Sequence, residues 1–138
     1  AQIAVDTIGI GAGVADMLRR DFGDMVVDVN AALRTDDGQN YNLRARMWRD
    51  MREWLKAGAS IPNDNDLITD LTALQYSYRG GCLLIESKDD AKKRGVKSPD
   101  RADSLALTFA YPVKKTDDWA VPAAVSVAWS ALDEVTGY

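Results

Sequence analysis

The feature that most constrains the fold is the order of segments near the N-terminus. Residues 3–8 form a short apolar run with Asp6 towards its end, and glycines follow at positions 9, 11 and 13. A helical stripe then ends near Gly23, and residues 25–29 form a second apolar run. A strand, a glycine turn, a helix and a strand in this order predict a βαβ unit with parallel strands. The chain is therefore predicted to be an α/β protein.

The middle of the chain predicts two helices and a hairpin. Residues 41–56 have helical periodicity, with apolar side chains on one face at Leu43, Met47, Met51, Trp54 and Leu55. A second helix is expected after residues 63–65, with Leu67, Ile68, Leu71 and Leu74 facing inward. Two short runs, 76–79 and 82–85, flank Gly80-Gly81, which predicts a β-hairpin.

The last third begins with a charged stretch, residues 86–97, which we interpret as a loop. Ser98-Pro99 then predicts a helix start, with Ser98 as N-cap and the helix running towards Pro112. Residues 113–138 have no clear period, and the tryptophans Trp119 and Trp129 indicate that part of this tail packs. No apolar run approaches the roughly 20 residues that span a bilayer, so no membrane segment is expected.

Composition limits the chemistry. The chain has no histidine and one cysteine, Cys82, which excludes the usual Ser-His-Asp and Cys-His systems and all histidine or four-thiolate zinc sites. A metal would need oxygen ligands, which favours Mg²⁺ or Mn²⁺. The net charge of −4 argues mildly against a broad DNA-binding face.

Three aspartates are candidate metal ligands. Asp6 lies near the end of a predicted strand, where ligands collect in open α/β sheets. Asp100 and Asp103, three residues apart at a helix start, share one helix face. Carboxylates from a strand end and a helix start can converge on one metal. Each aspartate taken alone is more commonly a turn residue or a favourable charge for the helix dipole.

Two other patterns are weaker. The glycines at 9, 11 and 13 fit a G-x-G-x-x-G nucleotide motif poorly, because Val14 stands at the third glycine position, so a tight strand-to-helix turn is the simpler interpretation. Basic residues form a weak prediction of DNA-backbone contact, with a solvated surface as the alternative. They are Arg79 at the hairpin tip and Lys88, Lys92, Lys93, Arg94 and Lys97.

Several segments together resemble the C-terminal nuclease domain of the large terminase subunit of tailed phages. They are residues 5–14 (VDTIGIGAGV), 42–48 (NLRARMW), 52–55 (REWL), 84–90 (LIESKDD), 93–95 (KRG) and 97–106 (KSPDRADSLA). The resemblance runs from about residue 3 to residue 112, and its last motif is the most specific. It divides the chain into a partial nuclease domain, 1–112, and a C-terminal tail, 113–138.

The resemblance implies a ribonuclease H-like mixed sheet flanked by helices, with a β-hairpin insertion. It also implies a metal-dependent endonuclease that cuts double-stranded DNA during genome packaging, with two Mg²⁺ or Mn²⁺ ions. Asp6 matches the second acid of that family, Asp103 the third and Asp100 an accessory position, and Lys88 is expected near the site. The family's first acid lies on an earlier strand that this chain lacks. We therefore expect the first strands to be missing, the chain to derive from a longer polypeptide, and its catalytic site to be incomplete.

The resemblance further implies a portal protein, a small terminase subunit and duplex DNA as partners in the cytoplasm of a bacterial host. Unpaired strand edges predict association between copies. Three alternatives stay open. The first is a non-catalytic fragment that docks to the motor or to DNA. The second is another ribonuclease H-like nuclease of the resolvase or integrase type, and the third is a nucleotide-binding βαβ domain.

Overall fold

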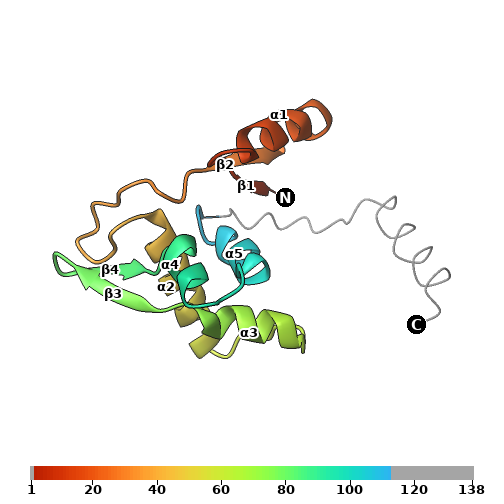
Figure 1. Ribbon diagram of the computed structural model, residues 1–138. Helices are drawn as coiled ribbons and strands as arrows, with labels where there is room; N and C mark the ends of the chain where they lie inside the picture. Colours follow the sequence, from red (N-terminus) through yellow and green to blue (C-terminus); the bar gives the residue numbers. More distant parts are fainter. Residues whose placement is uncertain (1, 113–138) are drawn as a thin grey trace, which may run out of the picture.

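The computed structural model describes residues 2–112, and the expected tail with Trp119 and Trp129 lies outside these residues. Figure 1 shows strands β1 and β2 with helix α1 at one end, and the hairpin β3–β4 with helices α2, α3 and α4 at the other. Helix α5 lies between them and packs against β1, α2 and α3. The mixed α/β architecture predicted from the sequence is confirmed. The described strands form two separate two-stranded sheets.

The N-terminal βαβ unit is confirmed. Strand β1 (Ile3–Asp6) pairs in parallel with β2 (Val26–Val29), and α1 (Gly11–Phe22) packs against both. Helix α1 starts earlier than the apolar stripe indicates, so that two of the three glycines lie inside it, and a short 3₁₀ turn (Gly23–Met25) leads into β2.

Helix α2 (Leu43–Lys56) provides the largest part of the core. Its start is fixed by Asn42, whose side chain accepts a hydrogen bond from the backbone N–H of Ala45. The apolar face predicted from periodicity is buried at Leu43, Met47 and Met51. Trp54 at its far end is 40% exposed and packs edge-to-face on Phe109. Helix α2 therefore joins the C-terminal helix to the rest of the molecule.

The hairpin forms as predicted, with β3 (Tyr76–Arg79) antiparallel to β4 (Cys82–Ile85). The loop before α2 runs beside β4: the N–H of Tyr41 donates to the carbonyl of Leu83, and the N–H of Leu83 donates to the carbonyl of Gln39, both at 2.8 Å. The loop thus continues the hairpin sheet by a few residues.

Three local predictions were wrong. The charged stretch 86–97 is not all loop, because the hydroxyl of Ser87 caps a helix, α4 (Lys88–Lys93). Helix α5 (Asp100–Leu107) begins one residue later than predicted, and Pro99 rather than Ser98 occupies its N-cap. In α3 (Asn65–Ala73), which is capped by the carboxylate of Asp64, Ile68 points outward and is 44% exposed. Among residues 2–112, no helix has both the length and the apolar character needed to cross a membrane.

Candidate functional site

Asp6 is the last residue of β1. Its Oδ1 accepts a hydrogen bond from the backbone N–H of Ile8 at 3.1 Å, which fixes the side chain at the strand end. Within the described residues its other carboxylate oxygen accepts no hydrogen bond, so it is available to a ligand.

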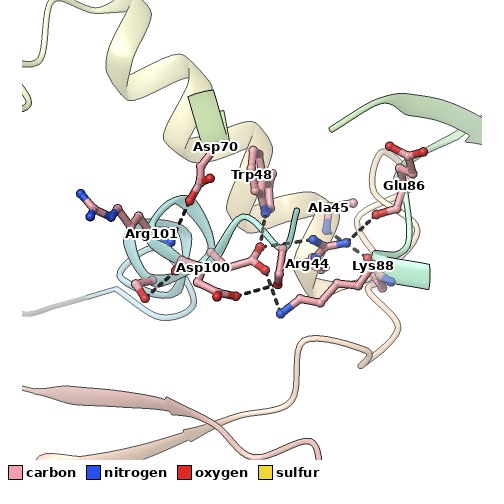
Figure 2. A network of polar contacts seen from close by, with 12 residues as sticks. Arg44, Ala45, Trp48, Asp70, Glu86, Lys88, Asp100 and Arg101 are labelled. Atoms are coloured by element: carbon pink, nitrogen blue, oxygen red, sulfur yellow. Dashed lines mark hydrogen bonds and ion pairs between the residues drawn. The ribbon is translucent and has the colours of Figure 1, made fainter. Parts of the chain in front are cut away.

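Asp103 lies one turn into α5 and is held by three groups from two other helices. Its Oδ1 accepts hydrogen bonds from Arg44 Nη2 and from Trp48 Nε1, both at 3.2 Å. Its Oδ2 forms an ion pair with Lys88 Nζ at 3.0 Å, and no described group donates a properly directed hydrogen bond to this buried oxygen. Figure 2 shows Arg44, Trp48 and Lys88 reaching towards the same point at the start of α5. Asp103 therefore has one oxygen that accepts two hydrogen bonds and one that is contacted by the ammonium of Lys88.

Asp6 and Asp103 line the same open cleft, whose volume is about 820 Å³. Arg44, Lys88 and Arg79 also line it, as do Glu86 and Asp90, so the cleft brings together four carboxylates and three cationic side chains. Glu86 and Asp90 are paired with Arg94 and Lys93. Asp6 and Asp103 come from β1 and α5, which pack directly on each other. The sequence predicted Asp6 at a strand end and Asp103 at a helix start, and in the fold both residues line this cleft.

Asp100 is placed differently. It is the first residue of α5, it is exposed, and its Oδ1 accepts a hydrogen bond from the hydroxyl of Ser98 at 2.6 Å. It does not line the cleft that contains Asp6 and Asp103. In residues 2–112 no group of three acidic side chains is assembled closely enough to hold a metal ion. Because Glu86 and Asp90 are paired with Arg94 and Lys93, the candidate ligands in the cleft are Asp6 and Asp103, which make up part of a divalent-cation site.

The basic residues near α4 have different surroundings. Arg94 donates to both carboxylate oxygens of Glu86, at 2.8 and 2.6 Å, and to the carbonyl of Ala73. This guanidinium lowers the pKa of Glu86. Lys93 pairs with Asp90 at 2.7 Å. Of the basic residues predicted to contact DNA, only Lys88 and Arg79 line the cleft, and Lys93, Arg94 and Lys97 lie away from it.

The arrangement of these elements matches solved structures of one kind of protein. The nuclease domain of the large terminase subunit gp2 of bacterial virus Sf6 aligns with a TM-score of 0.57 and 19% identity, over 80% of this chain and 65% of that one. A lysine-to-alanine variant of that domain with manganese and beta-thujaplicinol gives a TM-score of 0.61 at 17% identity, with the same coverage. The same variant with calcium gives 0.58 at 18%, over 80% and 64%.

Over 80% of its length the chain shares the fold of these solved terminase nuclease domains. It spans just under two thirds of the length of the solved domains, 65% of the chain in the first two. No protein-family model matches the sequence, and no curated protein matches it either.

Within this terminase nuclease fold, two residues of the candidate site were missed as site residues by the sequence argument. Arg44 and Trp48 were read as parts of a helix, yet both donate to Asp103 Oδ1. Arg44 Nη1 also donates to the carbonyl of Glu86 at 2.7 Å, which ties α2 to the end of the hairpin. Arg44 and Trp48 are four residues apart, which places them on one helix face. This spacing was the only feature of the sequence that could have indicated a shared partner.

Proposed function

We propose that this chain is the nuclease part of a phage DNA-packaging terminase and cuts double-stranded DNA with the help of divalent cations. The observation that supports this most is the cleft that Asp6, at the carboxyl end of β1, and Asp103 both line. Asp6 has an oxygen that accepts no hydrogen bond from the described residues, and Asp103 Oδ2 already contacts a cation, the ammonium of Lys88. Two of the structural neighbours were solved with manganese or calcium.

Asp6 and Asp103 are the residues that would hold the cation, which would be Mg²⁺ or Mn²⁺ because all the donors are oxygens. When bound, such an ion activates water and stabilises the leaving oxygen of a phosphodiester. The chain itself orients the ligands: the N–H of Ile8 holds Asp6, while Arg44 and Trp48 hold Asp103. We propose Asp100 as an accessory carboxylate. It would contribute negative charge at the start of α5 without lining the cleft.

The cationic groups of the cleft would attract the substrate. Lys88 and Arg79 line the cleft with the carboxylates and are partly or fully exposed. Phosphates of duplex DNA are the expected partners of such side chains, and contacts of this kind carry little sequence information. In the parent motor this role would place the chain beside the portal protein and the small terminase subunit, in the cytoplasm of the bacterial host.

The test is a plasmid-nicking assay with Mn²⁺, using EDTA as the metal-free control. Asp103→Asn and Asp6→Asn are expected to lose cutting almost completely, since each removes a ligand charge. Asp100→Asn is expected to keep most of the activity, because its side chain lies outside the cleft. Equal activity in the Asp103→Asn and unmodified chains would overturn the nuclease proposal.

Two competing functions give other results. If the unmodified chain binds duplex DNA but never cuts it, the non-catalytic, DNA-contacting function is favoured. If it cuts a four-way junction far faster than a linear duplex, a resolvase-type nuclease is favoured. The fold is compatible with either result, so the substrate decides between them.

We also propose that copies associate through an unpaired strand edge. Within the described residues β1 pairs only with β2, which leaves its other edge without a strand partner. Light scattering at increasing protein concentration is expected to show self-association. A strict monomer at the highest concentration would refute this proposal.

A further inference from the structure

Two arginines that are distant in sequence meet over one aromatic ring at the hairpin. The guanidinium carbon of Arg34 lies 3.9 Å from the ring centroid of Tyr41, and that of Arg79 lies 5.2 Å from it. Arg34 comes from the loop before α2, whereas Arg79 is the last residue of β3 before the Gly80-Gly81 turn. We call these three residues the Arg–Tyr–Arg stack.

The backbone around the stack is fixed. Tyr41 is hydrogen-bonded to β4 through its N–H, Arg34 forms an isolated bridge with Asn42, and Arg79 is paired with Cys82 in the hairpin. The hydroxyl of Thr35 donates to the carbonyl of Asn40 at 2.6 Å and closes the loop between them. The backbone contacts therefore fix where Arg34 and Arg79 start, and the ring of Tyr41 holds their guanidinium groups, which reduces the rotamer freedom lost on binding a ligand.

The charge of the stack is not compensated. Neither Arg34 nor Arg79 forms an ion pair or a side-chain hydrogen bond within residues 2–112, although most other arginines there do. The carboxylate of Asp37, in the same loop as Arg34, accepts hydrogen bonds from Asn40 and the N–H of Gln39 and forms no ion pair with either arginine in the described residues. Two exposed guanidinium groups with free N–H donors, stacked on one ring, fit phosphate oxygens better than any neutral ligand.

The position of the stack decides which phosphate it would bind. Arg79 lines the same cleft as Asp6 and Asp103, so the stack lies at the rim of the candidate site. From these contacts we infer that the Arg–Tyr–Arg stack binds the phosphate backbone of the duplex on the hairpin side of the cleft. This inference rests on the proposed function for its ligand. It adds Arg34 and Tyr41 to the residues expected to contact DNA; of the three residues in the stack, the sequence indicates only Arg79.

The test measures binding of a fluorescent DNA duplex, without divalent cation, over a range of salt concentrations. Each phosphate contact contributes about 0.9 to the slope of log affinity against log salt. Arg34→Ala and Arg79→Ala are each expected to make the slope shallower by about 0.9, and the double variant by about 1.8. At 0.1 M salt, affinity should fall on the order of tenfold per arginine. Arg20→Ala, an exposed arginine on α1, is the matched control and should change little.

Tyr41→Leu and Tyr41→Phe separate a binding role from a structural one. Phenylalanine keeps the ring and should bind DNA as the unmodified chain does, while leucine releases both guanidinium groups and should weaken binding without reducing the net charge. If the stack only rigidifies the loop, the arginine variants will lower unfolding free energy but leave the salt slope unchanged, which would overturn the inference. An unmodified chain that binds no duplex would overturn it as well.

The cutting and binding assays together distinguish failure of the proposed nuclease function from failure of this inference. A chain that cuts nothing with Mn²⁺, yet loses duplex affinity in the arginine variants, keeps the stack as a DNA-binding site and loses the nuclease proposal. A chain that cuts DNA but binds it equally well with and without Arg34 and Arg79 keeps the nuclease proposal alone.

Discussion

A β-carbon on Gly11 would lie 1.7 Å from the backbone carbonyl oxygen of Asp6. Helix α1 therefore starts directly against the end of β1, at the residue that carries a candidate metal ligand. The glycine turn has a packing role at this point, because only a residue without a side chain lets the helix approach the strand so closely. The nucleotide-binding interpretation of the three glycines is not needed to explain it.

Gly11→Ala is expected to push α1 away from β1 and to displace Asp6. Overpacking of this kind costs about 1–3 kcal/mol of unfolding free energy, and nicking should fall with it. Gly13→Ala is the matched control, since a β-carbon there meets nothing within 4 Å. Inside a helix that change should be neutral or stabilise by up to about 1 kcal/mol. Urea unfolding measures both, and equal effects of the two variants would refute the close-packing argument.

Trp48→Phe is expected to reduce cutting while the protein stays folded. The change keeps an aromatic ring in the core but removes the N–H that donates to Asp103 Oδ1. Loss of one hydrogen bond to a carboxylate should cost roughly 1.5–3 kcal/mol of stability and loosen the orientation of Asp103. Trp54→Phe is the control, because Trp54 is 40% exposed and packs on Phe109 at the far end of the same helix. If both variants cut DNA equally well, Trp48 does not position Asp103.

The sequence predicted the elements of this site better than its contacts. Asp6 and Asp103 were selected as candidates because strand ends and helix starts are visible as periodicity and capping residues. Arg44 and Trp48 were not, because their partner is 59 and 55 residues away, and no local pattern encodes that separation. The fold supplies it through the packing of α5 on α2.

The predictions made from the charged residues 86–97 were the other ones that the structure does not match. The stretch 86–97 has the composition of a solvated loop, but Ser87 caps its first turn and Ala91 is buried under it, which is enough for a short helix. Composition also suggested that Arg94 is available to DNA, whereas it donates to both oxygens of Glu86. A charged residue pairs with whatever the fold brings near, and sequence alone does not reveal that partner.

Lys88→Ala is expected to raise the affinity of the chain for Mn²⁺. The ammonium lies 3.0 Å from Asp103 Oδ2, so it competes with a cation for that oxygen. A like charge at about 4 Å costs about 1 kcal/mol even in water, and twice that for a divalent ion, which predicts a gain of about thirtyfold. Titration calorimetry with Mn²⁺ measures it, and Lys92→Ala on the exposed side of α4 is the control. Unchanged or weaker binding in Lys88→Ala would argue against a cation at Oδ2.

The loop that carries the Arg–Tyr–Arg stack depends on one carboxylate. Asp37 accepts hydrogen bonds from the backbone N–H groups of Gln39 and Asn40 and from the side-chain amide of Asn40, at 2.7–2.8 Å. These donors, the Asn40 amide first, lower the pKa of Asp37 from 3.8 to about 2. Asn40 is itself buried, so the carboxylate anchors the loop to the interior.

Acid should therefore weaken the hold of Asp37 on this loop. A carboxylate whose pKa is lower in the folded state stabilises that state above its unfolded pKa, and the contribution disappears as pH falls through the folded value. For Asp37 the loss is expected between about pH 4 and about pH 2. Asp37→Asn should be less stable than the unmodified chain at pH 7, and the difference should shrink across that interval. Urea unfolding at several pH values measures the difference, with the neighbouring Asp36→Asn as control. A difference between Asp37→Asn and the unmodified chain that stays constant from pH 7 to pH 2 would show that the charge of Asp37 does not hold the loop.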